Sequence, residues 1–263
     1  MTATDEVLYT VDRRVGTITI NRPDRKNAIN EGVLSGITHS LRQAEEDPDV
    51  GALVLRGAGG NFCAGADLGG GLVSDATPSF LELHQDRRNY ARLLLDMNSC
   101  AKPILAAIEG YCLAGGMGLC LASDMVIAAE EAQFGTPEIK RGLWPYMVTA
   151  LLIRNVGRKK ALELCMLGER ISAIEAQRIG LINHAVPAGE FEDKVRETAV
   201  KLASFSPAIM GLGKSAFYRI ADMSTDDALV FLQSQLTLNA QTEDIVEGIA
   251  AFFEKREPRW KGK

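Results

Sequence analysis

The chain has 263 residues, of which 46% are hydrophobic and 24% are charged, and its formal net charge is −5. A chain of this length can bury a large core without disulfides or metals, and it is too apolar to be disordered. The net negative charge argues against a nucleic-acid-binding protein, whose affinity would come from a basic surface.

The cysteines predict reduced thiols rather than disulfides or a zinc site. They form no CxxC pair and have no histidines at ligand spacing; they are Cys63, Cys100, Cys112, Cys120 and Cys165. The N-terminal sequence MTATDEVLYT lacks the pattern of a targeting segment. The most apolar region, residues 104–129, contains Glu109 and Asp124, which a membrane span would not carry without a partner. We therefore expect a cytosolic protein that binds neither nucleic acid nor membrane.

The first part of the chain predicts alternating strands and helices. Residues 17–20 alternate between polar and apolar side chains, as in a half-buried strand. Asn30 fits the N-cap of a helix that ends at Asp47 and Pro48. Short apolar runs predict further strands at residues 52–55, 103–108 and 125–128. Alternation of this kind is typical of an α/β core.

The last part of the chain predicts mainly helix. Ser206 fits an N-cap with Pro207 at the first helical position, and helical periodicity follows over residues 226–238 and 243–255. We therefore divide the chain into a core over residues 1–205 and a helical region over residues 206–263. The helical region would pack on the core or on a neighbouring subunit.

Two glycine-rich turns follow predicted strands and could carry chemistry. The first covers residues 61–68, NFCAGADL, and the second covers residues 110–118, GYCLAGGMG. Small residues let the main chain approach a ligand and leave amide N–H groups free. Two such turns could aim two amides at one carbonyl oxygen and form an oxyanion hole. On spacing alone, tight turns with close packing explain these stretches better. Neither a dinucleotide fingerprint nor a P-loop is present.

Four motifs, in order, resemble those of the crotonase superfamily, the enoyl-CoA hydratases and isomerases. They are NRPDRKNA at residues 21–28, FCAGADL at 62–68, GYCLAGG at 110–116 and AQFGTPEI at 132–139. The similarity runs from about Val15 to the tail, which contains FEKREP and WKG. It implies an α/β spiral of repeated ββα units, with a C-terminal helical region that assembles homotrimers or hexamers. It also implies a coenzyme A thioester as substrate, with no other bound cofactor.

The resemblance assigns roles to residues of these motifs. The amides of Ala66 and Gly115 would hold the thioester oxygen, and Glu138 would move protons. Further contacts with the substrate or its coenzyme A part would come from Arg25, Lys26, Ala28, Ala64, Asp67, Leu68, Gly118 and Trp144. Some of these residues have plainer interpretations. Asp67 fits a helix N-cap, and the two cations fit a solvated turn.

One position departs from the hydratases of the family, which use two glutamates. The first would stand at Gly118, where the carboxylate is missing, and the second is Glu138. One carboxylate beside an oxyanion hole is enough to take a proton from one carbon of a 3-enoyl thioester and return it to another. We therefore favour double-bond isomerisation. Hydration by Glu138 alone and a non-catalytic CoA-ester-binding protein are the alternatives.

Four other side chains near these motifs are further candidates for the site. Cys63 could be a nucleophile, but it has no histidine nearby in sequence and fits a small buried residue better. His84 lies in a segment, residues 80–95, that flanks the acyl pocket in relatives; it could orient water there, but it fits a solvated helix surface better. Trp144 and Tyr146 would shape the acyl pocket. Tyr146 could offer a hydroxyl, but we expect it to pack in the core.

Overall fold

The structure is a computed structural model that describes residues 6–67 and 79–263. Leu68, which the resemblance assigns to the substrate site, lies outside the described residues.

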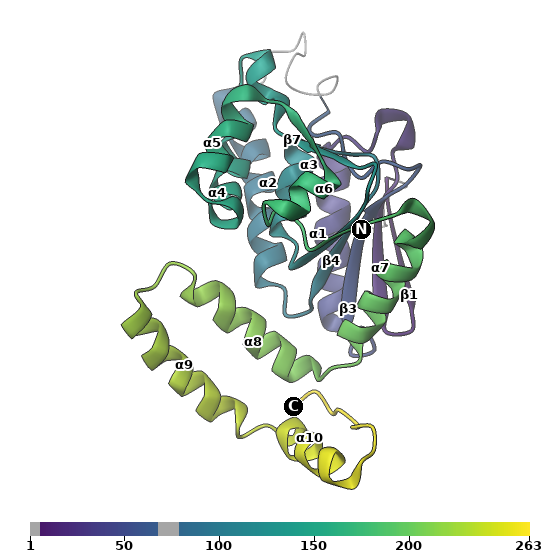
Figure 1. The fold of residues 1–263 in the computed structure, drawn as a ribbon, viewed down its shortest axis with the longest axis vertical. Helices are drawn as coiled ribbons and strands as arrows, with labels where there is room; N and C mark the ends of the chain where they lie inside the picture. The colour runs from purple at the N-terminus through teal and green to yellow at the C-terminus, as the bar shows by residue number, and fades with distance from the viewer. Residues whose placement is uncertain (1–5, 68–78) are drawn as a thin grey trace.

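The described strands form two sheets (Figure 1). The larger sheet has the order β1-β2-β3-β4-β6-β9, and in it only the pairing of β1 with β2 is antiparallel. Its strands are β1 Val7–Asp12, β2 Val15–Ile20, β3 Ala52–Gly57, β4 Ile104–Ile108, β6 Met125–Ala129 and β9 His184–Val186. The smaller sheet has the order β5-β7-β8, with strands β5 Tyr111–Leu113, β7 Gln133–Gly135 and β8 Arg170–Ser172.

Helices connect and cover these strands. The α-helices are α1 Glu31–Glu46, α2 Phe80–Ser99, α3 Gly115–Ala122, α4 Tyr146–Val156, α5 Arg158–Leu167, α6 Ala173–Arg178, α7 Ala188–Ala203, α8 Pro207–Ile220, α9 Thr225–Asn239 and α10 Glu243–Glu254. Two short 3-10 helices are η1 Pro23–Arg25 and η2 Pro137–Arg141. Asn30 caps α1 as predicted, because its side-chain oxygen accepts a hydrogen bond from Val33 N at 2.9 Å.

Both faces of the larger sheet are covered, which explains why its central strands are almost continuously apolar. On one face, Leu53, Leu55 and Ile104 pack in the main core with residues of α1 and α2. On the other face, Val54 and Leu105 pack in a second cluster with α7. Side chains of a strand alternate between the two faces of its sheet, so each central strand supplies both cores.

The chain passes repeatedly from the larger sheet to the smaller one and then into a helix. β4 leads through β5 into α3, and β6 leads through β7 into η2 and α4. This repeat confirms the predicted α/β architecture. The strands of the smaller sheet were not predicted, because three residues are too few to show a period-two pattern.

Helices α8, α9 and α10 lie together at one end of the molecule (Figure 1). Helix α8 is tied to the core by Lys214, whose Nζ lies 2.7 Å from Asp124 Oδ2. Asp124 also accepts hydrogen bonds from Tyr218 Oη at 2.9 Å and from Ile104 N at 2.7 Å. The side chains of Lys214 and Asp124 are only 6% and 17% exposed. The division of the chain between residues 205 and 206 stays a prediction, although α8 begins at Pro207.

Within residues 6–67 and 79–263, no helix combines the length and the apolarity needed to cross a bilayer.

The Lys214–Asp124 pair predicts that Lys214→Met lowers the free energy of unfolding by about 3 kcal/mol, because it leaves a buried carboxylate without its cation. The measurement is urea unfolding at pH 7 and fixed protein concentration. Arg154→Met is the matched control, since it breaks the exposed Arg154–Asp222 pair and should cost less than about 1 kcal/mol. Equal losses in the two variants would contradict the prediction.

Candidate active site

Three short parallel segments bring the predicted catalytic groups to one edge. Cys63 and Cys112 form a parallel β-bridge, and Cys112 stands opposite Phe134 in the parallel pair β5–β7. The three segments therefore run side by side in the same direction. Because parallel strands end at the same edge, the residues that follow them also lie at that edge. Those residues include Ala66, Gly115 and Glu138.

The two glycine-rich turns are in direct contact. A Cβ added at Gly65 would lie 3.5 Å from Gly115 N, and a Cβ added at Gly115 would lie 3.8 Å from Ala66 N. The turn at Gly65 needs a φ of 103°, which a glycine adopts readily. Among the described residues, no main-chain acceptor takes a hydrogen bond from the amide of Ala66 or of Gly115. The contact thus leaves two neighbouring amides available to an oxygen of a ligand.

Glu138 lies in η2, and one of its carboxylate oxygens is buried. Its Oε2 has no hydrogen-bond partner among the described residues. Burial raises the pKa of Glu138 above its ordinary value of 4.5, and its own backbone N–H and the charge of Arg141 offset this only in part. A buried, unpartnered carboxylate oxygen is costly to a fold and is typical of a functional site. Glu138 therefore differs from an ordinary surface glutamate.

Tyr90, in α2, is the residue of this region that sequence reasoning missed. Its hydroxyl donates a hydrogen bond to the carbonyl oxygen of Gly115 at 2.5 Å, and the residue is only 9% exposed. A methyl group added at Gly118 would overlap the same hydroxyl oxygen. The charge of Glu138 contributes to raising the pKa of Tyr90, which places the two side chains within electrostatic reach. The sequence shows that residue 118 has no side chain, but it does not indicate which side chain lies beside this position.

The first loop lies against the first glycine-rich turn. Ile29 forms a parallel bridge with Ala66, and Ala64 N donates a hydrogen bond to Lys26 O at 3.0 Å. The Lys26 ammonium lies 4.8 Å from the centre of the Tyr111 ring. The loop is therefore held beside the predicted oxyanion site by backbone contacts.

Arg22 and Asp67 are paired inside this loop region. Arg22 Nη2 lies 2.8 Å from Asp67 Oδ2, and Arg22 Nη1 donates to the carbonyl oxygen of the buried Ala28 at 2.6 Å. The guanidinium of Arg22 is thus bound by groups of the protein itself, while Arg25 and Lys26 are exposed. The N-cap role of Asp67 stays a prediction, because the residues after it lie outside the described range.

The wall residues divide into one packed and one exposed aromatic. Trp144 is half-buried against the main core and donates from Nε1 to Thr149 Oγ1 at 3.1 Å. The prediction that Tyr146 packs in the core is wrong, since it is 77% exposed. Tyr146 begins α4, whose buried side is formed by Val148 and Leu152, and a residue two positions before Val148 points away from that side.

The thiols and the histidine of this region have plain roles. Cys63 is buried, and burial raises its pKa to about 12, so the thiol stays protonated and the prediction of a small buried residue is confirmed. His84 is exposed on α2. Among the described residues, no group of three or more His, Cys, Asp and Glu side chains could hold a metal ion.

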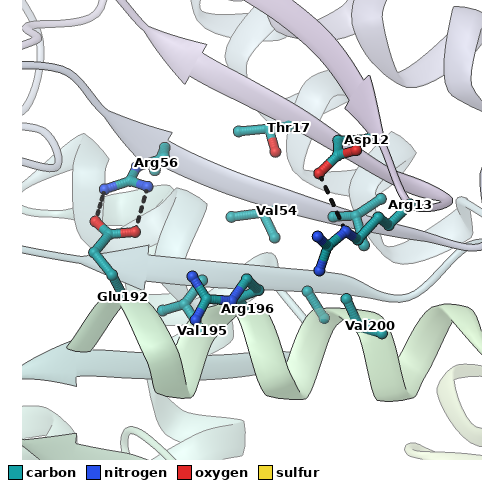
Figure 2. A pocket seen from close by; sticks show the side chains of 11 residues that line it. Asp12, Arg13, Thr17, Val54, Arg56, Glu192, Val195, Arg196 and Val200 are labelled. Atoms are coloured by element: carbon teal, nitrogen blue, oxygen red, sulfur yellow. Dashed lines mark hydrogen bonds and ion pairs between the residues drawn. The ribbon is translucent and has the colours of Figure 1, made fainter. Parts of the chain in front are cut away.

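A separate cavity of about 180 Å³ lies between the larger sheet and α7 (Figure 2). Its arginine Arg56 is bound through both terminal nitrogens to the carboxylate of Glu192, at 3.0 and 2.5 Å. Arg13, at the end of the β1–β2 hairpin, has its Nε 3.9 Å from Asp12 Oδ2. None of the predicted site residues lines this cavity, so it is not part of the candidate active site.

Comparison with known proteins places the chain in a family. The family model for enoyl-CoA hydratase/isomerase matches residues 10–263. A probable enoyl-CoA hydratase of Mycobacterium bovis is 35% identical over 257 residues, which are 97% of this chain and 98% of the relative. The 2,3-dehydroadipyl-CoA hydratase of Escherichia coli is 34% identical over 259 residues, which are 98% and 99% of the two chains.

A solved structure agrees with these sequence matches. The crystal structure of an enoyl-CoA hydratase from Bacillus anthracis superimposes with a TM-score of 0.92 at 32% identity, covering 98% of this chain and all of the other. The chain therefore belongs to the enoyl-CoA hydratase/isomerase family, and the predicted resemblance and fold class are confirmed.

Proposed function

We propose that this member of the enoyl-CoA hydratase/isomerase family moves the double bond of a 3-enoyl coenzyme A thioester. Glu138 carries the proton, and the amides of Ala66 and Gly115 hold the thioester oxygen. The observation that carries this proposal is the buried, unpartnered carboxylate oxygen of Glu138, in a site where the position of the second family glutamate is Gly118.

The reaction needs one base and one place for negative charge. Glu138 takes a proton from C2 of the 3-enoyl thioester, and the electron pair moves onto the thioester oxygen. The same proton then returns to C4, so the double bond ends between C2 and C3 and the carboxylate is regenerated. The amides of Ala66 and Gly115 stabilise the oxygen while it is charged, and one such donor is typically worth about 100- to 1,000-fold in rate.

Coenzyme A enters this site as part of the substrate. The exposed Arg25 and Lys26 are held beside the first turn, and cations of this kind suit the phosphates of the coenzyme. Trp144, half-buried against the main core, forms part of the wall beside the acyl group. All five cysteines are buried and unbridged, which fits a reducing cytosolic location.

Hydration is the second candidate, because the relatives described above are named hydratases. In that reaction, water adds OH to C3 and H to C2 of a 2-enoyl thioester. An assay separates the candidates by incubating the protein with 2-enoyl-CoA and 3-enoyl-CoA in turn. A mass gain of one water indicates hydration, and a change in ultraviolet absorbance at constant mass indicates isomerisation. Binding without turnover of either substrate indicates the non-catalytic alternative.

We also propose that α9 and α10 join copies of the chain into a trimer or a hexamer. Both helices expose large apolar side chains, including Phe252 at 78% and Phe253 at 77%. Exposed apolar groups gathered in this way mark interaction surfaces. Phe205, Ile209 and Trp260 line an apolar hollow of about 430 Å³ beside α10.

The first prediction of this proposal is that Glu138→Gln lowers kcat about 100- to 10,000-fold while KM changes little, because the base is lost and the binding surface is kept. Steady-state kinetics with 3-enoyl-CoA measures it. The folded protein is expected to be at least as stable at pH 7, because a neutral amide removes the cost of burying the charge. Glu163→Gln, on the exposed side of α5, is the control. A Glu138→Gln rate within about threefold of wild type would show that another group is the base.

The pH dependence gives a second prediction. Glu138 must be ionised to accept a proton, and burial raises its pKa above 4.5. We therefore expect kcat/KM to fall as the pH is lowered, with a midpoint above 4.5. A midpoint at or below 4.5 would contradict the environment that the structure gives this carboxylate.

A third prediction concerns assembly. Light scattering should give three or six chain masses for the wild type, and Phe252→Asp combined with Phe253→Asp should reduce this mass, because charges would face the apolar contact. Val11→Lys, on an exposed position of β1, should leave the mass unchanged. A monomeric wild type would rule out the proposed assembly.

A further inference from the structure

Tyr90 and Gly118 share one volume beside the proposed oxyanion site. The Tyr90 hydroxyl oxygen lies where the first side-chain atom of residue 118 would stand, and Tyr90 Cζ would be 3.1 Å from that atom. The next nearest atom, Leu94 Cδ1, would be in ordinary contact at 3.5 Å. A side chain at position 118 and the hydroxyl of Tyr90 therefore exclude each other.

The Tyr90 hydroxyl is also fixed relative to the turn. It donates a hydrogen bond to Gly115 O at 2.5 Å, and a Cβ added at Gly115 would lie 3.7 Å from this hydroxyl and 3.8 Å from Ala66 N. The phenol thus borders the same small space as the two amides. It holds Gly115 through its carbonyl oxygen, while the amide of Gly115 stays available to a ligand.

The chemistry of a phenol differs from that of the carboxylate it displaces. The pKa of Tyr90 is raised well above its ordinary value of 10, because the phenol is buried and the charge of Glu138 disfavours its anion. The hydroxyl is therefore neutral, and its hydrogen is already used in the hydrogen bond to Gly115 O. The hydroxyl therefore cannot serve as a base for an attacking water. Position 118 supplies no carboxylate either, so Glu138 has no second base beside it.

We propose that Tyr90 and Gly118 together determine the reaction of this site: the Tyr90 hydroxyl fills the place of a second acid, positions Gly115, and so favours proton transfer over the addition of water. This inference rests on the proposed function, since it concerns which reaction Glu138 performs. Tyr90 acts through Gly115 and through the volume it occupies, so it is a positioning and specificity-determining residue.

The test compares the ratio of hydrated to isomerised product in three variants. Tyr90→Phe keeps the ring and should lower kcat for isomerisation about three- to tenfold through loss of one hydrogen bond, with KM and the product ratio unchanged. Tyr90→Ala combined with Gly118→Glu replaces the phenol by a carboxylate. It should raise the ratio at least about tenfold, a modest share of what a general acid–base group contributes. Gly118→Glu alone should not raise this ratio, because the Tyr90 hydroxyl still occupies the volume that the new side chain needs.

Tyr9→Phe is the matched control for Tyr90→Phe. The Tyr9 hydroxyl is buried and has no hydrogen-bond partner among the described residues, and it lies beside Gly16, which belongs to none of the site motifs. Its loss should leave both kcat and the product ratio at wild-type values. A drop in kcat for Tyr9→Phe equal to that for Tyr90→Phe would overturn the positioning role of Tyr90.

A stability cycle tests the pair without any substrate. Gly118→Ala should lower Tm in the wild type, where the methyl group meets Tyr90, and raise it in Tyr90→Ala, where alanine simply favours the helix. The same sign in both backgrounds would show that the two positions do not compete. This cycle stays informative if the variant carrying glutamate at position 118 fails to fold.

The outcomes separate the two proposals. A folded double variant with an unchanged product ratio overturns the role of the pair and leaves Glu138 as the base. If the wild type hydrates 2-enoyl-CoA faster than it isomerises 3-enoyl-CoA, the proposed role of Tyr90 and Gly118 is overturned as well. The role of Glu138 as the base is then still tested by Glu138→Gln. If neither substrate is turned over, the proposed function fails, and so does the selection of a reaction by this pair, whatever the stability cycle shows.

Discussion

The parallel alignment of three short segments is the constraint on which the candidate site depends. Backbone hydrogen bonds join them: Leu113 N donates to Cys63 O at 2.9 Å, and Ala114 N donates to Gly135 O at 2.9 Å. These bonds set the register of turns that are far apart in the sequence. A shift of one residue would move each following group by about 3.3 Å, which is more than the tolerance of a reactive geometry. The chemistry of the site is therefore fixed by the main chain before any side chain is considered.

Much of this arrangement could be predicted from the sequence, and the part that could not has physical reasons. The central strands and the cap at Asn30 follow from local patterns, and the motifs identify both turns and Glu138. Tyr90 could not be predicted, because its role depends on a contact between α2 and α3 that leaves no local signal. The exposure of Tyr146 depends on which side of α4 faces the core, and a single aromatic residue at the start of a helix does not reveal this.

Two partly buried carboxylates show how differently the fold treats acidic groups. Asp124 is surrounded by donors from Lys214, Tyr218 and the main chain of β4. Glu138 keeps one oxygen that is buried and unpartnered. The first arrangement stabilises the contact between α8 and the core. The second has a free-energy cost to folding, and the proposed exchange of protons with a ligand requires a carboxylate oxygen that no protein group already binds.

The overlap between Tyr90 and position 118 also constrains how this protein can change by mutation. A single substitution that introduces a side chain at position 118 meets an occupied volume, and a single truncation of Tyr90 leaves a void and removes one hydrogen bond to the carbonyl oxygen of Gly115. Each of these two single substitutions is therefore expected to lower the stability of the fold through poorer packing. A change of both residues together avoids the overlap that a change at position 118 alone creates.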